Sequence, residues 1–526
     1  MTPVEAPTRS PSVEGPGWAS PRRPRWAGPP ARLVGRSARL AGGLAVAVGV
    51  TVTAVHLPAR DAPFVLAAGP VLLVLVMVAH RLGPRWCLAG LVATTTIGWY
   101  TVSKSVGRVN LRLTDIPFVA LLVWAVVIRV RRGPRRVDVG QAALTAFIGV
   151  LLLSLLPVLA TSPHEFAGNF VSWARLAETF GIVWLVPYAL DRPGDRRFIM
   201  KVVVVSCTAA VGWAILQAGI HGQLGERLAT RQEGPDTIGL IGAILAVTVL
   251  YGSVPRRRWP RLALFALAVV AIALSHSVGS IVAAGLVIGL APLPRSSNRR
   301  RWSGLLLPLR VLLLVIALIG IVVALRPANL PGASSFGSGT TQARLIYATD
   351  GIEQLQRNPL LGVGFQRSQL PQNVADPSIV ADLHRRFPTV ANSVFPDPQA
   401  CNDPSTAGSC DTGSVHDAYI QVGAESGAIG CVVLVLTVWA MARRIHVARR
   451  RVPGTEFDAS LRWALLMLIT VMIWWNDNPL FGAQPETVFA ALALGVVATP
   501  WLSTRTPSGN LLDAPAVAIA GDRSDQ

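Results

Sequence analysis

Two side chains suited to group transfer flank one long polar stretch of this sequence: Arg344 lies near its beginning and His416 at its end. A guanidinium group binds a diphosphate through paired hydrogen bonds and offsets its charge as it leaves. An imidazole at the mouth of an apolar helix can accept a proton near neutral pH. Arg344 is therefore a candidate diphosphate ligand, and His416 is a candidate general base for an acceptor hydroxyl or a donor that orients the diphosphate.

Both residues also have a purely structural interpretation. His416 could anchor the helix that follows it, and Arg344 could lie on the solvated face of a loop helix. Arg227 and Arg231, on the polar connection 221–236, are candidates to complete the diphosphate site. An ordinary polar loop explains these two arginines equally well, and spacing does not say which of them binds.

Other polar and small residues near this stretch are expected to hold the backbone. Glu425 follows His416 by nine residues, two and a half helical turns, and so lies on the opposite face of the helix, where it favours a packing hydrogen bond over catalysis. Asn358-Pro359 ends a helix that apolar residues three and four apart predict up to Leu355, with Thr340-Thr341 as its cap. Four glycines are expected at turns and close packing contacts: Gly362, Gly364, Gly427 and Gly430.

The composition is that of an integral membrane protein. Of 526 residues, 52% are hydrophobic and 14% are charged, whereas roughly 25% of residues are charged in soluble proteins. The net charge of +20 comes from arginines clustered between apolar runs. This distribution indicates basic cytoplasmic loops and anionic lipid, and it argues against a nucleic-acid partner.

At about 20 apolar residues per crossing, the sequence predicts an all-α polytopic protein with about fourteen transmembrane helices. The expected spans are 40–57, 62–80, 86–101, 115–130, 139–160, 170–190, 198–219, 237–254, 261–275, 278–293, 304–325, 418–441, 460–475 and 487–502, although 261–293 could be one re-entrant pair. The arginine clusters all fall on one side of this arrangement, which the positive-inside rule assigns to the cytoplasm. Both termini are then cytoplasmic, in a cytoplasmic (inner) membrane.

The predicted organisation has five parts: a disordered cytoplasmic tail (1–38), transmembrane helices 1–11 (39–325), an extracytoplasmic catalytic loop (326–415), transmembrane helices 12–14 (416–502) and a second disordered tail (503–526). Cys401 and Cys410 lie in the loop, where an oxidising compartment favours a local disulfide. This pair alone is poor evidence for a metal site, so none is expected. The sequence shows no Gly-rich phosphate-binding motif, so an activated substrate must come from the lipid phase or a gradient must drive the process.

These residues together resemble the O-antigen ligase and polymerase superfamily. The resemblance is carried by Arg344, by Asn358-Pro359-Leu360-Leu361-Gly362-Val363-Gly364, by His416-Asp417-Ala418-Tyr419-Ile420 and by Glu425-Ser426-Gly427-Ala428-Ile429-Gly430. It covers roughly residues 110–500. Asp417 stands where the family usually has Asn, and the cysteine-containing loop is a further departure.

The resemblance implies a glycosyltransferase of the GT-C kind, without metal or other cofactor. Such a protein moves a glycan from a polyprenyl-diphosphate donor to a lipid or glycan acceptor on the outer face of the membrane, in cell-envelope polysaccharide biosynthesis. Whether it is a ligase or a polymerase stays open. A transporter or flippase of lipid-linked oligosaccharide, and a non-catalytic scaffold of an envelope-assembly complex, are the alternatives.

Overall fold

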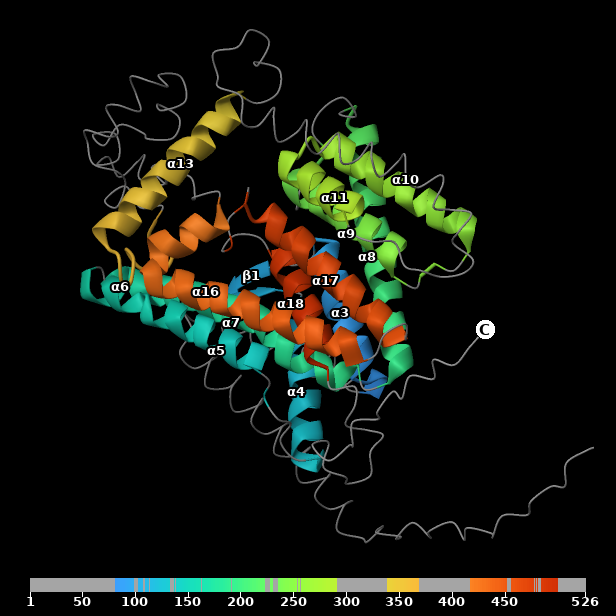
Figure 1. Cartoon of the computed structure of the whole chain (residues 1–526), viewed down its shortest axis with the longest axis horizontal. Coiled ribbons are helices and arrows are strands. Elements are labelled where there is room, and N and C mark those ends of the chain that lie inside the picture. The colour runs from blue at the N-terminus through green and yellow to red at the C-terminus, as the bar shows by residue number, and fades with distance from the viewer. Residues whose placement is uncertain are drawn as a thin grey trace, which may run out of the picture.

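The computed structural model describes residues 81–98, 103–106, 109–112, 114–132, 137, 139–161, 163–190, 192–222, 228–229, 235–252, 254–255, 257–290, 338–368, 417–451, 456–476, 478, 480 and 484–499. They form a bundle of helices with one two-stranded hairpin (Figure 1). The elements are α3 (Pro84–Thr96), β1 (Ser103–Val106), β2 (Val109–Arg112), α4 (Asp115–Arg132), α5 (Val139–Leu153), α6 (Leu155–Thr161), α7 (Pro163–Ala189), α8 (Pro193–Ile220), α9 (Pro235–Tyr251), α10 (Arg258–Ser275), α11 (Val278–Leu290), α13 (Ser338–Arg357), α16 (Ala418–Arg451), α17 (Glu456–Trp474) and α18 (Gln484–Ala498).

Each span predicted within the described residues coincides with helix, and the span at 139–160 is divided between α5 and α6. Five helical segments are long and apolar enough to cross a membrane, namely Val139–Ala160, Gly194–Ile220, Arg258–Ser275, Ala418–Arg450 and Phe457–Trp474. Helices α9, α11 and α18 are apolar but shorter. The described residues thus show a helical membrane protein but not a count of about fourteen spans. The spans expected at 40–57, 62–80 and 304–325 lie outside them.

Two expectations differ from the structure in detail. Strands β1 and β2 pair antiparallel, Ser103 opposite Arg112, where the sequence suggested only a connection. The strands are separated in sequence by Gly107-Arg108, a glycine-containing dipeptide typical of hairpins. Helix α13 begins at Ser338, so Thr340 lies inside the helix and does not cap it.

Helix α9 is the centre of one half of the bundle. Its residues from Thr237 to Tyr251 are all buried, among α8, α10, α11 and α17. A Cβ added at Gly242 would lie 3.1 Å from the carbonyl oxygen of Ala268 in α10, so the two backbones are in close contact. Helices in lipid associate largely through such packing of small residues. In the other half, α16 packs along α5, and α18 packs along α7.

Arginine-rich helix ends gather at one end of the bundle. The guanidinium of Arg196, at the start of α8, lies 4.3 Å from the ring centre of Phe457, at the start of α17. Arg444, near the end of α16, donates to the carbonyl oxygens of Val497 (3.1 Å) and Ala498 (3.2 Å) at the end of α18. The starts of α8 and α17 and the ends of α16 and α18 therefore share one end, as the positive-inside pattern requires.

Candidate functional site

The site is built where the chain leaves α13 and meets α16. Helix α13 ends at Arg357, and the next residues turn back, since the amide of Gly362 donates to the carbonyl oxygen of Asn358 at 3.0 Å. Gly362 and Gly364 have φ values of +68° and +108°, which side chains with a Cβ rarely adopt. We call residues 358–368 the motif loop.

The motif loop is joined to α16 at a break in that helix. Gly427 has φ 67° and ψ −166°, so the regular hydrogen bonds of the helix are interrupted there. The carbonyl oxygens of Ala424 and Glu425 accept instead from the amides of Val363 (2.8 Å) and Gly364 (3.2 Å). The amide of Ala428 donates to the carbonyl oxygen of Pro359 at 2.7 Å. Backbone groups freed by the break are thus satisfied by the loop, as is required away from water.

Glycine is required at the contact between loop and helix because the backbones nearly touch. A Cβ at Gly362 would overlap the backbone at Ala424 and Glu425, and one at Gly427 would overlap the carbonyl of Leu360. Gly364 lies against α5 and α6, where its Cβ would be 2.8 Å from Cγ2 of Val158. At these three glycines the close contacts are made by the backbone, which leaves no room for a Cβ.

Glu425 is fully buried and ties the motif loop to α16. Its carboxylate accepts from the amide of Gln366 (2.7 Å), the hydroxyl of Ser368 (2.6 Å) and Nε2 of Gln421 (3.2 Å). Gln421 in turn accepts the amide of Leu480 through Oε1 at 2.9 Å. With all these contacts inside the protein, Glu425 positions the backbone, as the sequence favoured.

Asp417 caps the start of α16. Its Oδ1 accepts from the amides of Tyr419 (2.8 Å) and Ile420 (3.0 Å), which satisfies two of the free donors of the first turn. Burial raises the pKa of this carboxyl above its usual value, and the two amides oppose that shift. An Asn here would make the same cap, so the departure from the family pattern preserves the local structure.

Three chain segments distant in sequence meet near this cap. The amide of Ala418 donates to the carbonyl oxygen of Trp475 at 2.9 Å, and the indole of Trp474 donates to that of Asp236 at 3.2 Å. Leu228, within the connection 221–236, donates its amide to the carbonyl oxygen of Leu274, at the end of α10, at 2.8 Å. The starts of α9 and α16 and the ends of α10 and α17 therefore share the end of the bundle opposite the arginine-rich one.

Several residues predicted for the site are not described. His416, Arg227, Arg231, Cys401 and Cys410 lie outside the described residues. Arg344 lies within α13, but its side chain is also outside them. Two described residues close in sequence to His416 and Arg231 approach the same tryptophan pair: Ala418 contacts Trp475, and Asp236 contacts Trp474.

An ion-pair network that the sequence only partly revealed lies between α4 and α7. Arg175 and Glu178 lie one helical turn apart in α7 and pair at 2.8 Å (Nη1 to Oε2). Arg175 also binds Asp115 through two contacts, Nη1 to Oδ1 at 2.8 Å and Nη2 to Oδ2 at 3.1 Å. Asp115 further accepts the amide of Arg112 at 2.9 Å and so fixes the end of β2. The sequence signal for this network is an aspartate, Asp115, at the start of an apolar span. Its partner Arg175 lies 60 residues away in the sequence, so the pairing itself could not be predicted.

Metal ligands do not cluster in the part of the chain that the structure describes, where no group of three or more His, Cys, Asp or Glu side chains could hold an ion.

Fold and site define a polytopic helical membrane protein with a polar segment inserted into a broken helix. Residues 263–435 match the family described as O-Antigen ligase (Wzy_C). The match runs from α10 through α13 and the motif loop to Val435 in α16. Over these residues it confirms the resemblance to the O-antigen ligase and polymerase superfamily, and the rest of the stretch 110–500 lies outside the match. No curated protein matches the chain.

Proposed function

We propose that this protein is a glycosyltransferase that moves a glycan from a polyprenyl-diphosphate donor to a lipid or glycan acceptor on the outer face of the cytoplasmic membrane. The observation that carries the proposal is the family match over residues 263–435, which spans α13, the motif loop and the break in α16. A likeness confined to apolar spans would fit a transporter or scaffold equally well. Here the matched region includes the segment in which the acid-base and diphosphate groups were predicted.

In the proposed reaction, His416 takes the proton from the acceptor hydroxyl as its oxygen attacks the anomeric carbon of the donor sugar. The bond from that carbon to the diphosphate oxygen breaks, and polyprenyl diphosphate leaves with both bonding electrons. Arg344, with Arg227 or Arg231, offsets the charge of the leaving group. No ion or cofactor is needed in this scheme. One displacement without a covalent enzyme intermediate inverts the configuration of the transferred sugar.

The fixed loop supports this scheme because transfer requires that acceptor and donor be held in line. The motif loop follows α13, which carries Arg344, and Asp417 follows His416 at the start of α16. Hydrogen bonds from Val363 and Gly364 to α16 connect the loop to that same helix. Helix α13, which carries Arg344, is thereby joined through the motif loop to α16, which begins two residues after His416.

The test is transfer by purified protein in vesicles, supplied with lipid-linked donor and candidate acceptors. We expect a product with inverted linkage and release of polyprenyl diphosphate. Glycolipid profiling of a deletion strain identifies the donor through the lipid-linked intermediate that accumulates. Movement of intact donor across the vesicle membrane without transfer would favour a flippase, and unchanged glycolipids in the deletion strain would contradict the proposal.

A further inference from the structure

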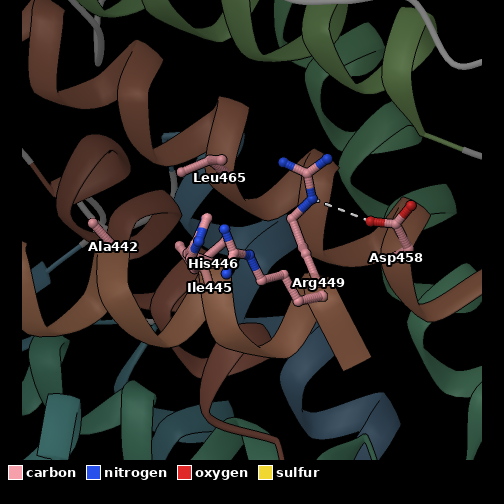
Figure 2. Close-up of a pocket in the computed structure, with 7 residues that line it drawn as sticks. Ala442, Ile445, His446, Arg449, Asp458 and Leu465 are labelled. Carbon is pink, nitrogen blue, oxygen red and sulfur yellow. Dashed lines mark hydrogen bonds and ion pairs between the residues drawn. The ribbon is translucent and has the colours of Figure 1, made fainter. Parts of the chain in front are cut away.

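A second polar site lies between α16 and α17, at the arginine-rich end of the bundle. A cavity of about 480 Å³ is lined by Ala442, Ile445, His446, Arg449 and Arg450 of α16 and by Asp458 and Leu465 of α17. Figure 2 shows the α16 side chains alongside Leu465 and Asp458. The volume of the cavity falls in the range of ligand pockets. It lies about seven helical turns from the start of α16, far from the motif loop.

The cavity carries excess positive charge. Asp458 is its acidic lining residue, and it is shared between Arg449 (Nε to Oδ1, 3.1 Å) and Arg462 (Nη2 to Oδ2, 2.9 Å). Arg450 is the second guanidinium of the lining, and Arg462 makes a third in this group of charges although it does not line the cavity. One carboxylate against three guanidinium groups leaves two positive charges without a counter-charge in this set. A phosphate group supplies that counter-charge, and arginine is the residue that binds it most specifically.

Hydrogen-bond donors remain for such a group. Asp458 accepts a hydrogen bond from Nε of Arg449, and Figure 2 shows that the two terminal nitrogens of Arg449 lie beyond that contact. Arg450 and His446 are both exposed, on the same side of the helix because four residues make about one turn. Three side chains can therefore direct N–H groups at one ligand without breaking the Arg449–Asp458 ion pair.

The apolar surface beside the cavity suits a lipid. Exposed apolar residues run along α16 toward the cavity: Val432 (57% exposed), Val435 (66%), Leu436 (51%) and Trp439 (59%). Spacings of three and four continue this stripe into His446 and Arg450, so both share its face. On a membrane-spanning helix such a stripe contacts acyl chains. A ligand with a phosphate head and an apolar tail matches both features at once.

We propose that this cavity binds an anionic phospholipid. The phosphate lies against His446, Arg449 and Arg450, and an acyl chain lies along the stripe from Val432 to Trp439. The positive-inside assignment of this end makes the ligand a lipid of the inner leaflet. The site is independent of the transfer reaction, since it lies at the other end of α16 from the motif loop.

The experiment measures lipid retention by the full-length protein in nanodiscs of phosphatidylcholine that contain a minor fraction of phosphatidylglycerol. Native mass spectrometry after release counts the lipids that stay bound. We expect selective retention of phosphatidylglycerol by the wild type and a loss of about tenfold or more for Arg450→Gln, because one charge-assisted contact to phosphate is removed. The double variant Arg449→Gln/Arg450→Gln should lose more.

Arg129→Gln is the matched control. Arg129 is an exposed arginine near the end of α4 and does not line the cavity. It should retain phosphatidylglycerol as the wild type does. An equal loss in Arg129→Gln would show a non-specific basic surface and overturn the proposal.

A second arm separates lipid from free phosphate. Inorganic phosphate and glycerol 3-phosphate, added at millimolar concentration to protein in phosphatidylcholine, should not raise the thermal stability that phosphatidylglycerol raises. Equal stabilisation by the soluble phosphates would assign the site to a soluble anion and contradict the lipid assignment. Equal retention of phosphatidylcholine and phosphatidylglycerol would contradict it as well.

Discussion

His416 is the residue on which the proposed transfer depends most. We expect His416→Ala to abolish glycan transfer while the lipid-linked donor still binds, because a positioned base contributes about 10²–10⁴-fold to such a step. Wild-type activity should also fall on the acid side as the imidazole becomes protonated. His221→Ala is the control, since His221 is exposed at the end of α8. Transfer by His416→Ala at the wild-type rate would remove the base from the mechanism.

Arg344 tests the diphosphate contact. Arg344→Lys keeps the charge but not the planar fork that binds two oxygens at once. We therefore expect transfer to fall at least tenfold with unchanged protein level, measured with purified enzyme at fixed donor concentration. Arg357→Lys is matched to it, because Arg357 is an exposed arginine of the same helix that pairs with Glu353. Equal activity of both variants would exclude the paired contact at Arg344.

Asp417 gives a prediction with a defined pH dependence. Burial raises the pKa of the Asp417 carboxyl in the folded protein. The stability that this shift adds to the fold is therefore present at pH values below the ordinary carboxyl pKa range, and it is lost as the pH rises through the raised pKa. Asp417→Asn retains an acceptor for the amides of Tyr419 and Ile420 without charge. We expect the variant to melt at or above the wild-type temperature at pH 7, with the difference disappearing in acid.

Asp417→Ala should instead lower the free energy of unfolding by about 0.5–2 kcal/mol both at pH 7 and in acid, because the helix cap itself is removed. Thermal unfolding in detergent at both pH values distinguishes the variants. A wild type that is more stable than Asp417→Asn at pH 7 would show that the charge itself stabilises α16.

The break in α16 is the element that joins the loop to the bundle. Gly427→Ala places a Cβ against the carbonyl of Leu360, at a φ of +67°. We expect destabilisation of more than about 2 kcal/mol, measured as a loss of folded protein or of melting temperature. Gly149→Ala is the control, since nothing lies within 4 Å of its added Cβ. In the interior of α5 this change should be neutral or stabilise by up to about 1 kcal/mol. Equal melting temperatures of the two variants would contradict the close contact at Gly427.

Elements were more predictable from the sequence than the contacts between them. The end of α13 at Arg357 follows from Asn358-Pro359, and most of the membrane helices follow from apolar runs. The hairpin β1–β2 was missed because each strand is only four residues long. Such short segments leave little periodicity to read.

For contacts between residues distant in sequence, the sequence could predict that a residue is buried and hydrogen-bonded, but not which residue is its partner. The burial and hydrogen bonding of Glu425 were expected, but its partner Ser368 lies 57 residues away. The bond from Arg175 to Asp115 joins two helices whose packing no local pattern reveals. A pattern thus indicates that a buried charge needs a partner, whereas the identity of the partner depends on how the helices pack.

At the scale of the whole molecule, the arrangement of helix ends supports the proposed orientation. Arg196 and Phe457 meet at one end, with Arg444 near the end of α18. Asp236, Trp475 and the start of α16 meet at the other. Since arginine-rich ends face the cytoplasm in most membrane proteins, the segment 369–416 would be extracytoplasmic.

The orientation predicts that Cys401 and Cys410 face outward and form a disulfide. An impermeant maleimide applied to intact cells should label the protein only after reduction, and the Cys401→Ser/Cys410→Ser variant should not be labelled at all. The other cysteines serve as an internal control, because Cys87 and Cys207 are buried in helices and Cys431 is half-buried within the apolar span of α16. In the double serine variant, a further Arg450→Cys change at the exposed end of α16 should be labelled only in permeabilised cells. If Arg450→Cys reacts in intact cells, or the loop cysteines react only after permeabilisation, the protein has the opposite orientation, and the proposed base would then face the cytoplasm.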